Sequence, residues 1–379
     1  MLPAPKRDRL TLADVLPSCL AALAAKDNRM RLPRVTRAVV ILVDGLGAAS
    51  LRSRAGHART LSAVLGASTT IDSGFPTTTA SALATLATGT APGQHGLVGY
   101  TVLDAANDRV VNQLSGWDER IDPATWQSQP TVFEIAVREG IRAVAVGPER
   151  YRDSGFSQAI LRGAEYRAAA SISARFEAAR DWLREPGKAG LLYLYVPELD
   201  VAAHANGWES AEWTRRLETV DAEVRGLTAS LRANEGVLVT ADHGVVDVPV
   251  RSHVLVDRIP GLLDGVRFVA GDPRCLQLHF NEALDAESRD ALVERWRASE
   301  SDRAWIATRA EAIAANWFGE VLPEVEPRIG DLLVAARKNI AYYDDRTATA
   351  RSQAMIGQHG SWSPAEVQVP LLRFGAFSK

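Results

Sequence analysis

Three runs of apolar residues constrain the fold of this chain more than any other feature. They span residues 35–43, 190–196 and 236–240, and each is rich in β-branched or large apolar side chains. A strand that is apolar on both faces is typical of a parallel sheet covered by helices on each side. Helical patterns at 169–185 and 209–234 alternate with these runs. The alternation predicts an α/β fold with a mostly parallel central sheet.

After about residue 251, the order of the expected strands and helices changes. Strand patterns at 266–270 and 275–280 come first, and helical patterns follow them instead of alternating with them. This order suggests a small α+β unit. We therefore predict a core formed by residues 1–250 and 341–379, interrupted by an α+β insertion at 251–340.

The composition and charge exclude several classes of protein. Of the 379 residues, 46% are hydrophobic and 23% are charged, which is ordinary for a globular protein and excludes a disordered or fibrous chain. The net charge of -3 and the dispersed basic residues give no reason to expect nucleic-acid binding. The two cysteines, Cys19 and Cys275, stand alone, which excludes a disulfide scaffold and a cysteine-rich zinc site.

No segment has the character of a membrane span or a signal peptide. The basic stretch near the N-terminus is followed by Asp14 and Pro17, not by an unbroken apolar run. No stretch approaches the roughly 18 apolar residues that a membrane span needs. We therefore expect a cytoplasmic protein that does not bind membranes. The oligomeric state is left open by the sequence.

An acidic residue follows each of the three apolar runs, namely Asp44, Asp200 and Asp242. Ligands of open α/β sheets bind beyond the carboxyl ends of the strands, so we expect these carboxylates to converge at one edge of the sheet. His204 lies four residues after Asp200, which places both side chains on one face of a helical turn. His243 directly follows Asp242. Carboxylates and imidazoles in one cleft are good ligands for zinc or manganese.

A third histidine extends this set. His359 lies in a Gly-Gln-His-Gly segment near the end of the chain. Three carboxylates and three imidazoles are enough for two metal ions with open positions. Taken singly, Asp44 and Asp242 could be turn residues, and a lone histidine could be structural. Their repeated position at strand ends favours a metal centre instead.

The segment before a short helical pattern at 80–87 supplies a candidate nucleophile. Pro76 and the threonines Thr77, Thr78 and Thr79 come directly before this pattern. A helix N-terminus favours negative charge, because its backbone N–H groups point outward. A threonine hydroxyl is a poor nucleophile until a metal lowers its pKa. A threonine that only caps the helix is the structural alternative.

Five segments together resemble the nucleotide pyrophosphatase/phosphodiesterase branch of the alkaline phosphatase superfamily. Each one alone is a weak signal, but they occur in the order found in that family. They cover roughly residues 37–100, 190–250 and 350–375. The segments are VVILVDGLG, FPTTTASALATLATGTAPGQHG, LDVAAH, TADHG and GQHG.

The resemblance implies a fold, a nucleophile and a reaction. The implied fold is a three-layer alkaline phosphatase-like α/β core with a small α+β insertion. Counting back from the Thr-Gly and His-Gly pairs of the family's nucleophile segment puts the nucleophile at Thr79, with Thr77 and Thr78 as competing choices. The implied reaction is the hydrolysis of a phosphodiester or phosphoanhydride bond in a small phosphate-ester substrate, through a phospho-threonine intermediate.

The resemblance also implies two metal sites. The usual ion of the family is zinc, and manganese is the alternative that the ligand set also allows. The first ion is assigned to Asp200, His204 and His359. The second ion is assigned to Asp44, Asp242, His243 and the Thr79 oxygen.

The chain departs from the family at one substrate-side position. The characterised phosphodiesterases have an asparagine five residues beyond the histidine of the His-Gly pair, and here this position is Tyr100. A tyrosine hydroxyl can also donate a hydrogen bond to phosphate, so we assign Tyr100 to substrate binding, with packing as the alternative. The preference for nucleotides is therefore left open. Tyr151 and Trp208 are further candidates for the substrate pocket.

Three other functions are compatible with these motifs. A phosphonoacetate-type phosphonate hydrolase shares the threonine and both metal sites, and basic pocket residues would distinguish it. The sequence does not place Arg150, Arg152 or Lys188 in the pocket. A phosphomonoesterase could use the same site with a more closed pocket. From another class, a metal-binding protein without turnover would keep the ligands, although the complete set together with Thr79 favours an enzyme.

Overall fold

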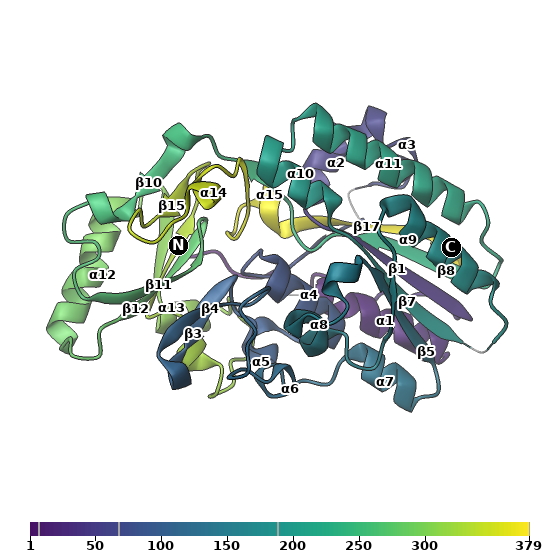
Figure 1. Cartoon of the computed structure of the whole chain (residues 1–379), viewed down its shortest axis with the longest axis horizontal. Helices are drawn as coiled ribbons and strands as arrows, with labels where there is room; N and C mark the ends of the chain where they lie inside the picture. The colour runs from purple at the N-terminus through teal and green to yellow at the C-terminus, as the bar shows by residue number, and fades with distance from the viewer. Residues whose placement is uncertain (7, 67–68, 188, 379) are drawn as a thin grey trace.

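The computed structural model describes residues 1–6, 8–66, 69–187 and 189–378, and its two larger sheets lie side by side along the long axis (Figure 1). The larger sheet has the strand order β2-β17-β8-β1-β7-β5-β6. Its strands, in that order, are Thr70–Asp72, Gln368–Gly375, Glu235–Thr240, Arg37–Val43, Gly190–Val196, Arg142–Gly147 and Glu165–Ala168.

The central strand β1 explains why the apolar runs are so uniform. It pairs in parallel with β7 on one side and with β8 on the other, and all of its residues are buried. Strands β5 and β6 continue the parallel arrangement, whereas β17 and β2 are antiparallel. The mixed but mostly parallel sheet confirms the expected α/β fold.

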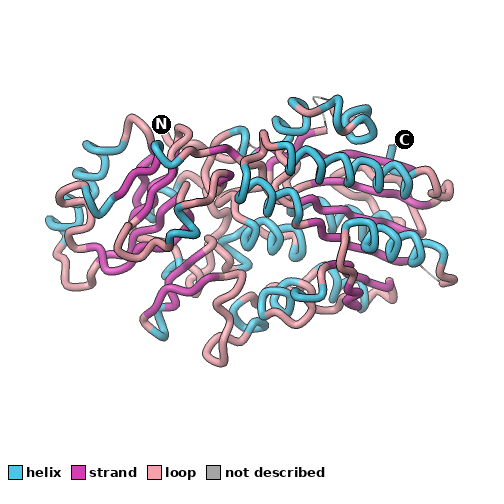
Figure 2. The backbone as a smooth tube through the Cα atoms, turned by 45° about the horizontal axis from the view of Figure 1, so that its top comes forward, coloured by secondary structure: helices cyan, strands magenta, loops and turns pink. Residues whose placement is uncertain are grey.

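Helices cover both faces of this sheet and give it three layers (Figures 1 and 2). On one face, α9 packs against β5 and β7, and α11 lies beside α9 and α10. On the other face, α1 contacts β1 and β7, α7 contacts β5, and α4 contacts both helices. The bounds are α1 Val15–Leu23, α4 Thr79–Thr88, α7 Val132–Arg138, α9 Ile172–Arg184, α10 Glu198–Asn206 and α11 Ala211–Thr228.

The second sheet is antiparallel and has the order β13-β14-β12-β11-β3-β4. Strands β3 (Thr101–Asp104) and β4 (Arg109–Asn112) come from a stretch far upstream of the others. The expected insertion at 251–340 therefore shares its sheet with an earlier segment, and its status as a separate domain stays a prediction. The remaining elements are β11 Val266–Asp272, β12 Cys275–Phe280, α12 Ala286–Glu300, β13 Ala304–Thr308 and β14 Leu332–Ala336.

Short elements connect these units. Strand β10 (His253–Leu255) pairs with β15 (Ala341–Tyr343), and β9 (Val246–Asp247) pairs with β16 (Gly357–Gln358). The short helices are α2 Ala48–Ser53, α3 Arg59–Ala63, α5 Pro92–His95, α6 Pro123–Trp126, α8 Gly155–Ile160, α13 Arg309–Ala314, α14 Ala350–Gln353 and α15 Pro364–Val367.

Local sequence signals set several element boundaries. Helix α4 ends at Gly89, which adopts a left-handed conformation with φ of 69° that glycine tolerates. Helix α11 is shorter than the pattern at 209–234 indicated, and it ends at Thr228. The Ser210 side chain accepts a hydrogen bond from the Trp213 amide and sets its start. None of the described helices has both the length and the apolar character needed to span a membrane.

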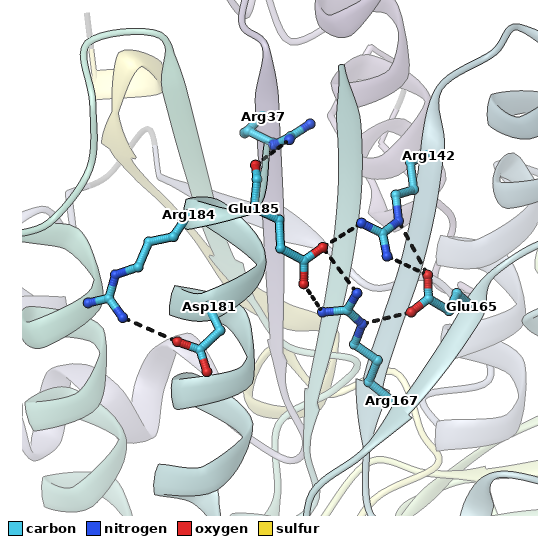
Figure 3. A network of polar contacts seen from close by, with 7 residues as sticks. All are labelled: Arg37, Arg142, Glu165, Arg167, Asp181, Arg184 and Glu185. Atoms are coloured by element: carbon cyan, nitrogen blue, oxygen red, sulfur yellow. Dashed lines mark hydrogen bonds and ion pairs between the residues drawn. The ribbon is translucent and has the colours of Figure 1, made fainter. Parts of the chain in front are cut away.

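An ion-pair network ties together the amino ends of β5 and β6 and the end of α9 (Figure 3). Arg142 contacts Glu165 at 2.7 Å and Glu185 at 2.5 Å, and Arg167 contacts the same two carboxylates at 2.9 and 2.7 Å. Arg37 donates to the Glu185 backbone carbonyl at 3.2 Å. The network lies at the amino ends of these parallel strands, which is the end of the sheet opposite to Asp44, Asp200 and Asp242.

Candidate metal centre and active site

The sheet brings the three predicted carboxylates to one edge. Asp44 directly follows β1, Asp242 lies just beyond β8, and Asp200 lies in the first turn of α10 after β7. Because these three strands are neighbours and run in parallel, their carboxyl ends coincide. All three carboxylates are buried.

The carboxylates and histidines form two groups that share one residue. Ligand atoms of Asp200, His243 and His359 lie within 4.8 Å of one another, and so do those of Asp44, Asp242 and His243. His243 Nε2 is 3.5 Å from Asp44 Oδ1 and 3.4 Å from Asp242 Oδ2. The imidazole of His243 stacks on that of His359, with ring centroids 3.7 Å apart. The two groups therefore form one continuous cluster.

His204 joins the cluster through the helical spacing that the sequence predicted. It follows Asp200 by one turn of α10, and its Nε2 lies 3.1 Å from Asp200 Oδ2. His359 Nε2 lies 3.9 Å from Asp200 Oδ1. Asp200 is thus in contact with both histidines assigned to the same ion, while the assignment itself stays a prediction.

Backbone carbonyls orient all three imidazoles. In each histidine, Nδ1 lies within hydrogen-bond distance of a carbonyl oxygen, at 2.7 Å in His204, 3.2 Å in His243 and 2.8 Å in His359. A proton held on Nδ1 leaves the Nε2 lone pair free for a metal ion. The carbonyl partners are, in the same order, Gly357, Gly244 and Thr77.

Unpartnered oxygens at the cluster fit a cation. Among the described residues, Asp44 Oδ1, Asp200 Oδ1 and Asp242 Oδ2 are buried and accept no hydrogen bond. A buried carboxylate oxygen without a partner is costly in free energy, and a divalent cation removes that cost. The donor set of carboxylates and imidazole nitrogens suits zinc or manganese.

The pKa values reflect the crowding of like charges. Burial and the neighbouring carboxylates of Asp242 and Asp200 raise the pKa of Asp44 well above its usual range. Burial alone would also raise the pKa of Asp200, but His204 and the other histidines hold it below its usual range. Burial opposes the charged form of His204, yet Asp200 raises its pKa to about 9. The cluster is therefore a site that positive charge stabilises.

Of the three threonines, the structure directs Thr79 at the cluster. Thr79 is the first residue of α4, and its Oγ1 lies 3.1 Å from His243 Nε2. The Thr77 hydroxyl donates instead to the Ser361 carbonyl at 2.8 Å. Thr78 occupies the N-cap position, and its buried hydroxyl has no hydrogen-bond partner among the described residues.

Two further residues contact the cluster and were not predicted. The Tyr195 hydroxyl donates a short hydrogen bond to Asp44 Oδ2. The Gly45 amide donates to Asp242 Oδ1 at 3.1 Å, which fixes that carboxylate. Tyr193 and Tyr195 are two residues apart in the otherwise apolar strand β7, so their side chains lie on the same face of the sheet. Two hydroxyl groups on one face of a buried strand were the sequence signal that could have indicated a role for these tyrosines at the site.

A mostly apolar pocket lies beside Thr79. Tyr151, one of the predicted candidates, lines it, and the Arg150 guanidinium lies 4.7 Å from the centre of the Tyr151 ring. Arg152 pairs with Glu149 at 2.8 Å, and Lys188 lies outside the described residues. Other lining residues are Leu83, Leu114, Phe156, Ile160, Tyr166, Tyr193 and Tyr195.

The remaining aromatic candidates lie elsewhere. Tyr100 is 38% exposed and borders a different groove, where its backbone amide donates to Asp272 at 3.4 Å. The Trp208 ring packs against Trp213 with centroids 6.2 Å apart, and Arg54 covers it. Neither residue lines the pocket beside Thr79.

Solved structures define the class of fold. Human ectonucleotide pyrophosphatase/phosphodiesterase 5 superposes with a TM-score of 0.68 at 15% identity, covering 89% of this chain and 87% of that chain. An inactive variant of the murine protein, in complex with AMP, superposes with a TM-score of 0.67 at 16% identity, covering 89% and 88%. The fold is therefore of the alkaline phosphatase-like class.

The family follows from the sequence comparison. The model of type I phosphodiesterase / nucleotide pyrophosphatase matches residues 38–362. The chain belongs to the type I phosphodiesterase/nucleotide pyrophosphatase family, as its motifs indicated.

Individual relatives share only about a quarter of the aligned residues with this chain. A pyrophosphatase/phosphodiesterase of Schizosaccharomyces pombe, itself named as uncharacterized, is 24% identical over 276 residues, which are 66% of this chain and 55% of that protein. Venom phosphodiesterase 2 of Crotalus adamanteus is 27% identical over 184 residues, which are 46% of this chain and 22% of that protein. The chain thus spans about half the length of the first relative and about a fifth of the venom enzyme.

Proposed function

We propose that this chain is a metal-dependent hydrolase of phosphodiester or phosphoanhydride bonds in small phosphate esters, with Thr79 as its nucleophile. One observation carries the proposal: the Thr79 hydroxyl lies at a helix N-terminus, 3.1 Å from a histidine that belongs to both acidic groups. Membership of the family supports the reaction class.

Two divalent ions would be held by the cluster. Zinc suits the donor atoms, and manganese is the alternative. Ions bound here would lower the pKa of the Thr79 hydroxyl and offset the charge of the phosphate. The first would be held by Asp200, His204 and His359. The second would be held by Asp44, Asp242, His243 and the Thr79 oxygen.

The chain's own groups account for the bond changes. Thr79 Oγ1, once its proton is lost to solvent, attacks phosphorus in line, so that a bond from Oγ1 to phosphorus replaces the bond to the leaving oxygen, which departs with the electron pair and takes a proton from water. Backbone N–H groups at the start of α4 face the charge that develops on the phosphoryl oxygens. A water molecule then attacks phosphorus and replaces the bond to Oγ1, which restores the threonine hydroxyl and releases the phosphate with the organic group that it retained.

The surroundings of Thr79 bear on the substrate. We propose that the pocket of tyrosines and aliphatic side chains beside Thr79 holds the organic group of the ester. The murine relative, whose structure is titled as an inactive threonine-to-alanine variant in complex with AMP, supports a nucleotide as one such group. Tyr100 remains our proposed phosphate-side contact, because the residue is exposed at the border of the neighbouring groove.

Metal content and ester preference test this function together. Purified protein should hold about two zinc or manganese ions per chain and hydrolyse bis-p-nitrophenyl phosphate faster than p-nitrophenyl phosphate. Faster turnover of the monoester would indicate a phosphomonoesterase. Activity on phosphonoacetate alone would indicate a phosphonate hydrolase. Binding of metal without any turnover would contradict the enzymatic function.

A further inference from the structure

A buried ion pair joins the second sheet to the loop that carries His359. Arg274 lies in the turn between β11 and β12, and Glu366 lies in α15. Both side chains are fully buried. The guanidinium engages the carboxylate with two hydrogen bonds, from Nε to Oε1 at 2.8 Å and from Nη2 to Oε2 at 2.7 Å. This forked geometry fixes the orientation as well as the distance of the two groups.

Further hydrogen bonds satisfy the rest of the pair. Arg274 Nη1 donates to the carbonyls of Lys338 and Ile340, at 2.7 and 2.8 Å. Glu366 Oε1 also accepts from the Ser361 amide at 3.0 Å. A buried polar network whose members are all satisfied holds its segments in one arrangement. Here the network holds the turn between β11 and β12 and the segment after His359 in a fixed relation to each other.

From Ser361 the bonds lead directly to His359. The Ser361 carbonyl accepts from the Thr77 hydroxyl at 2.8 Å, and the same hydroxyl accepts from the Gly360 amide at 3.0 Å. The Thr77 carbonyl pairs with His359 Nδ1 at 2.8 Å. The loop at 359–361 is therefore held by Thr77 on one side and by Glu366 on the other.

Direct packing supports the same connection. Gly360 has a φ of 131°, and a Cβ atom built on it would lie 2.8 Å from Asp272 Cβ and 3.6 Å from Arg274 Cβ. The turn of the second sheet therefore presses against the residue next to His359. A side chain at position 360 would have no space between them.

We propose that Arg274 is a positioning residue of the metal centre: through Glu366 and Ser361 it fixes the imidazole of His359. The role rests on the proposed metal centre. Groups that orient a metal ligand through hydrogen bonds usually affect metal affinity by about 10- to 100-fold. The second sheet would then contribute to metal binding without supplying a ligand itself.

Metal affinity of a paired variant tests this role. The double variant Arg274→Met/Glu366→Met replaces the ion pair by apolar side chains of similar length, a change that buried pairs often tolerate without loss of the fold. In competition with a zinc chelator, we expect one of the two ions to bind about 10- to 100-fold more weakly. His359→Ala identifies the ion concerned, because it should weaken the same one.

A second variant and a matched control separate positioning from stability. Arg274→Lys keeps the charge but cannot form both hydrogen bonds to the carboxylate, so it should lower the affinity for the same ion by a smaller factor. If the double variant unfolds, the affinity of Arg274→Lys serves as the test. Arg109→Met/Asp104→Leu removes another buried carboxylate and its arginine from the second sheet, 3.0 Å apart in the structure, and should leave both affinities unchanged.

Two results would overturn the proposal, and they differ in meaning. Wild-type affinity for both ions in the folded double variant, or in folded Arg274→Lys if the double variant unfolds, would show that Arg274 does not position His359. A wild-type chain that takes up no zinc or manganese would overturn the metal centre itself, and the role of Arg274 with it.

Discussion

The three threonine hydroxyls at the start of α4 contact different groups, and these contacts indicate different roles. Thr79 contacts His243, Thr77 holds the loop after His359, and Thr78 has no hydrogen-bond partner among the described residues. The sequence left all three open as nucleophiles. The spacing within the motif favoured Thr79, but only the direction of each side chain distinguishes them physically.

Replacement of these threonines should separate the nucleophile from its neighbour. Thr79→Ala should lower the initial rate of diester hydrolysis by at least about 10³-fold, because of the three threonines only Thr79 directs its hydroxyl at the cluster. Its metal content should stay near that of the wild type, measured by mass spectrometry of the metals. Thr78→Ala should retain most of the activity. Equal losses in both variants would contradict the assignment.

A buried histidine outside the cluster makes stability depend on pH. The His95 imidazole is hydrogen-bonded to the Thr85 hydroxyl at 2.9 Å and accepts from the Leu97 amide at 3.1 Å, so both of its nitrogens have a partner. Burial, with a smaller contribution from Arg328, lowers the pKa of His95 to about 3. Between this value and the usual value near 6.5, the unfolded chain binds a proton that the folded chain does not.

The free energy of unfolding should therefore fall as the pH drops from about 6.5 towards 3, by up to about 4 kcal/mol from this residue alone. His95→Gln removes the titrating group, so its unfolding free energy should depend less on pH over the same range. Denaturant titrations of both proteins at several pH values measure the difference. Parallel pH profiles would show that His95 does not contribute.

At the scale of elements, the sequence predicted strands with uniform apolar character and missed those that depend on a partner. Strands β7 and β12 have the predicted bounds, because both of their faces are buried whatever the details of pairing. The short strands β3, β4 and β13 carry no such signal. They exist because neighbouring strands of the second sheet supply their hydrogen bonds.

The start of helix α7 is set by hydrogen bonds between residues that are close in the sequence. The Thr131 side chain accepts from the Glu134 amide at 3.0 Å, while Glu134 accepts from the Thr131 amide at 2.8 Å. Thr131→Ala should lower the free energy of unfolding by about 1 to 2 kcal/mol, because the cap is lost. Thr131→Ser keeps the hydroxyl, so its free energy of unfolding should fall much less. Urea denaturation of the three proteins compares them, and equal stabilities would contradict the capping role.

At the scale of the whole molecule, the cluster draws on segments from both halves of the chain. The carboxyl ends of parallel strands explain why Asp44, Asp200 and Asp242 could be placed together from the sequence. The position of His359 could not be derived in this way, because it depends on a loop held by Thr77 and Glu366. The second sheet was predicted only in part: its strands at 266–270 and 275–280 were expected, but the contribution of residues 101–112 was not.

Removal of metal should destabilise the whole molecule. Without cations, the carboxylates of the cluster repel one another in a buried site. Zinc at about 100 times its dissociation constant should stabilise the fold by about 2.7 kcal/mol for each site. Thermal unfolding after treatment with a chelator should therefore occur at a lower temperature, and added zinc should restore it. Unchanged unfolding temperatures would contradict the metal centre.

The formation of a phosphoryl bond to Thr79 tests the central claim most directly. Protein mixed with bis-p-nitrophenyl phosphate and quenched in acid should contain a fraction heavier by one phosphoryl group with the p-nitrophenyl ester that it retains, which peptide mass spectrometry should place on Thr79. The same treatment of Thr79→Ala should give no modified peptide. The same adduct on another residue, or rapid turnover with no modified protein at any quench time, would contradict the account.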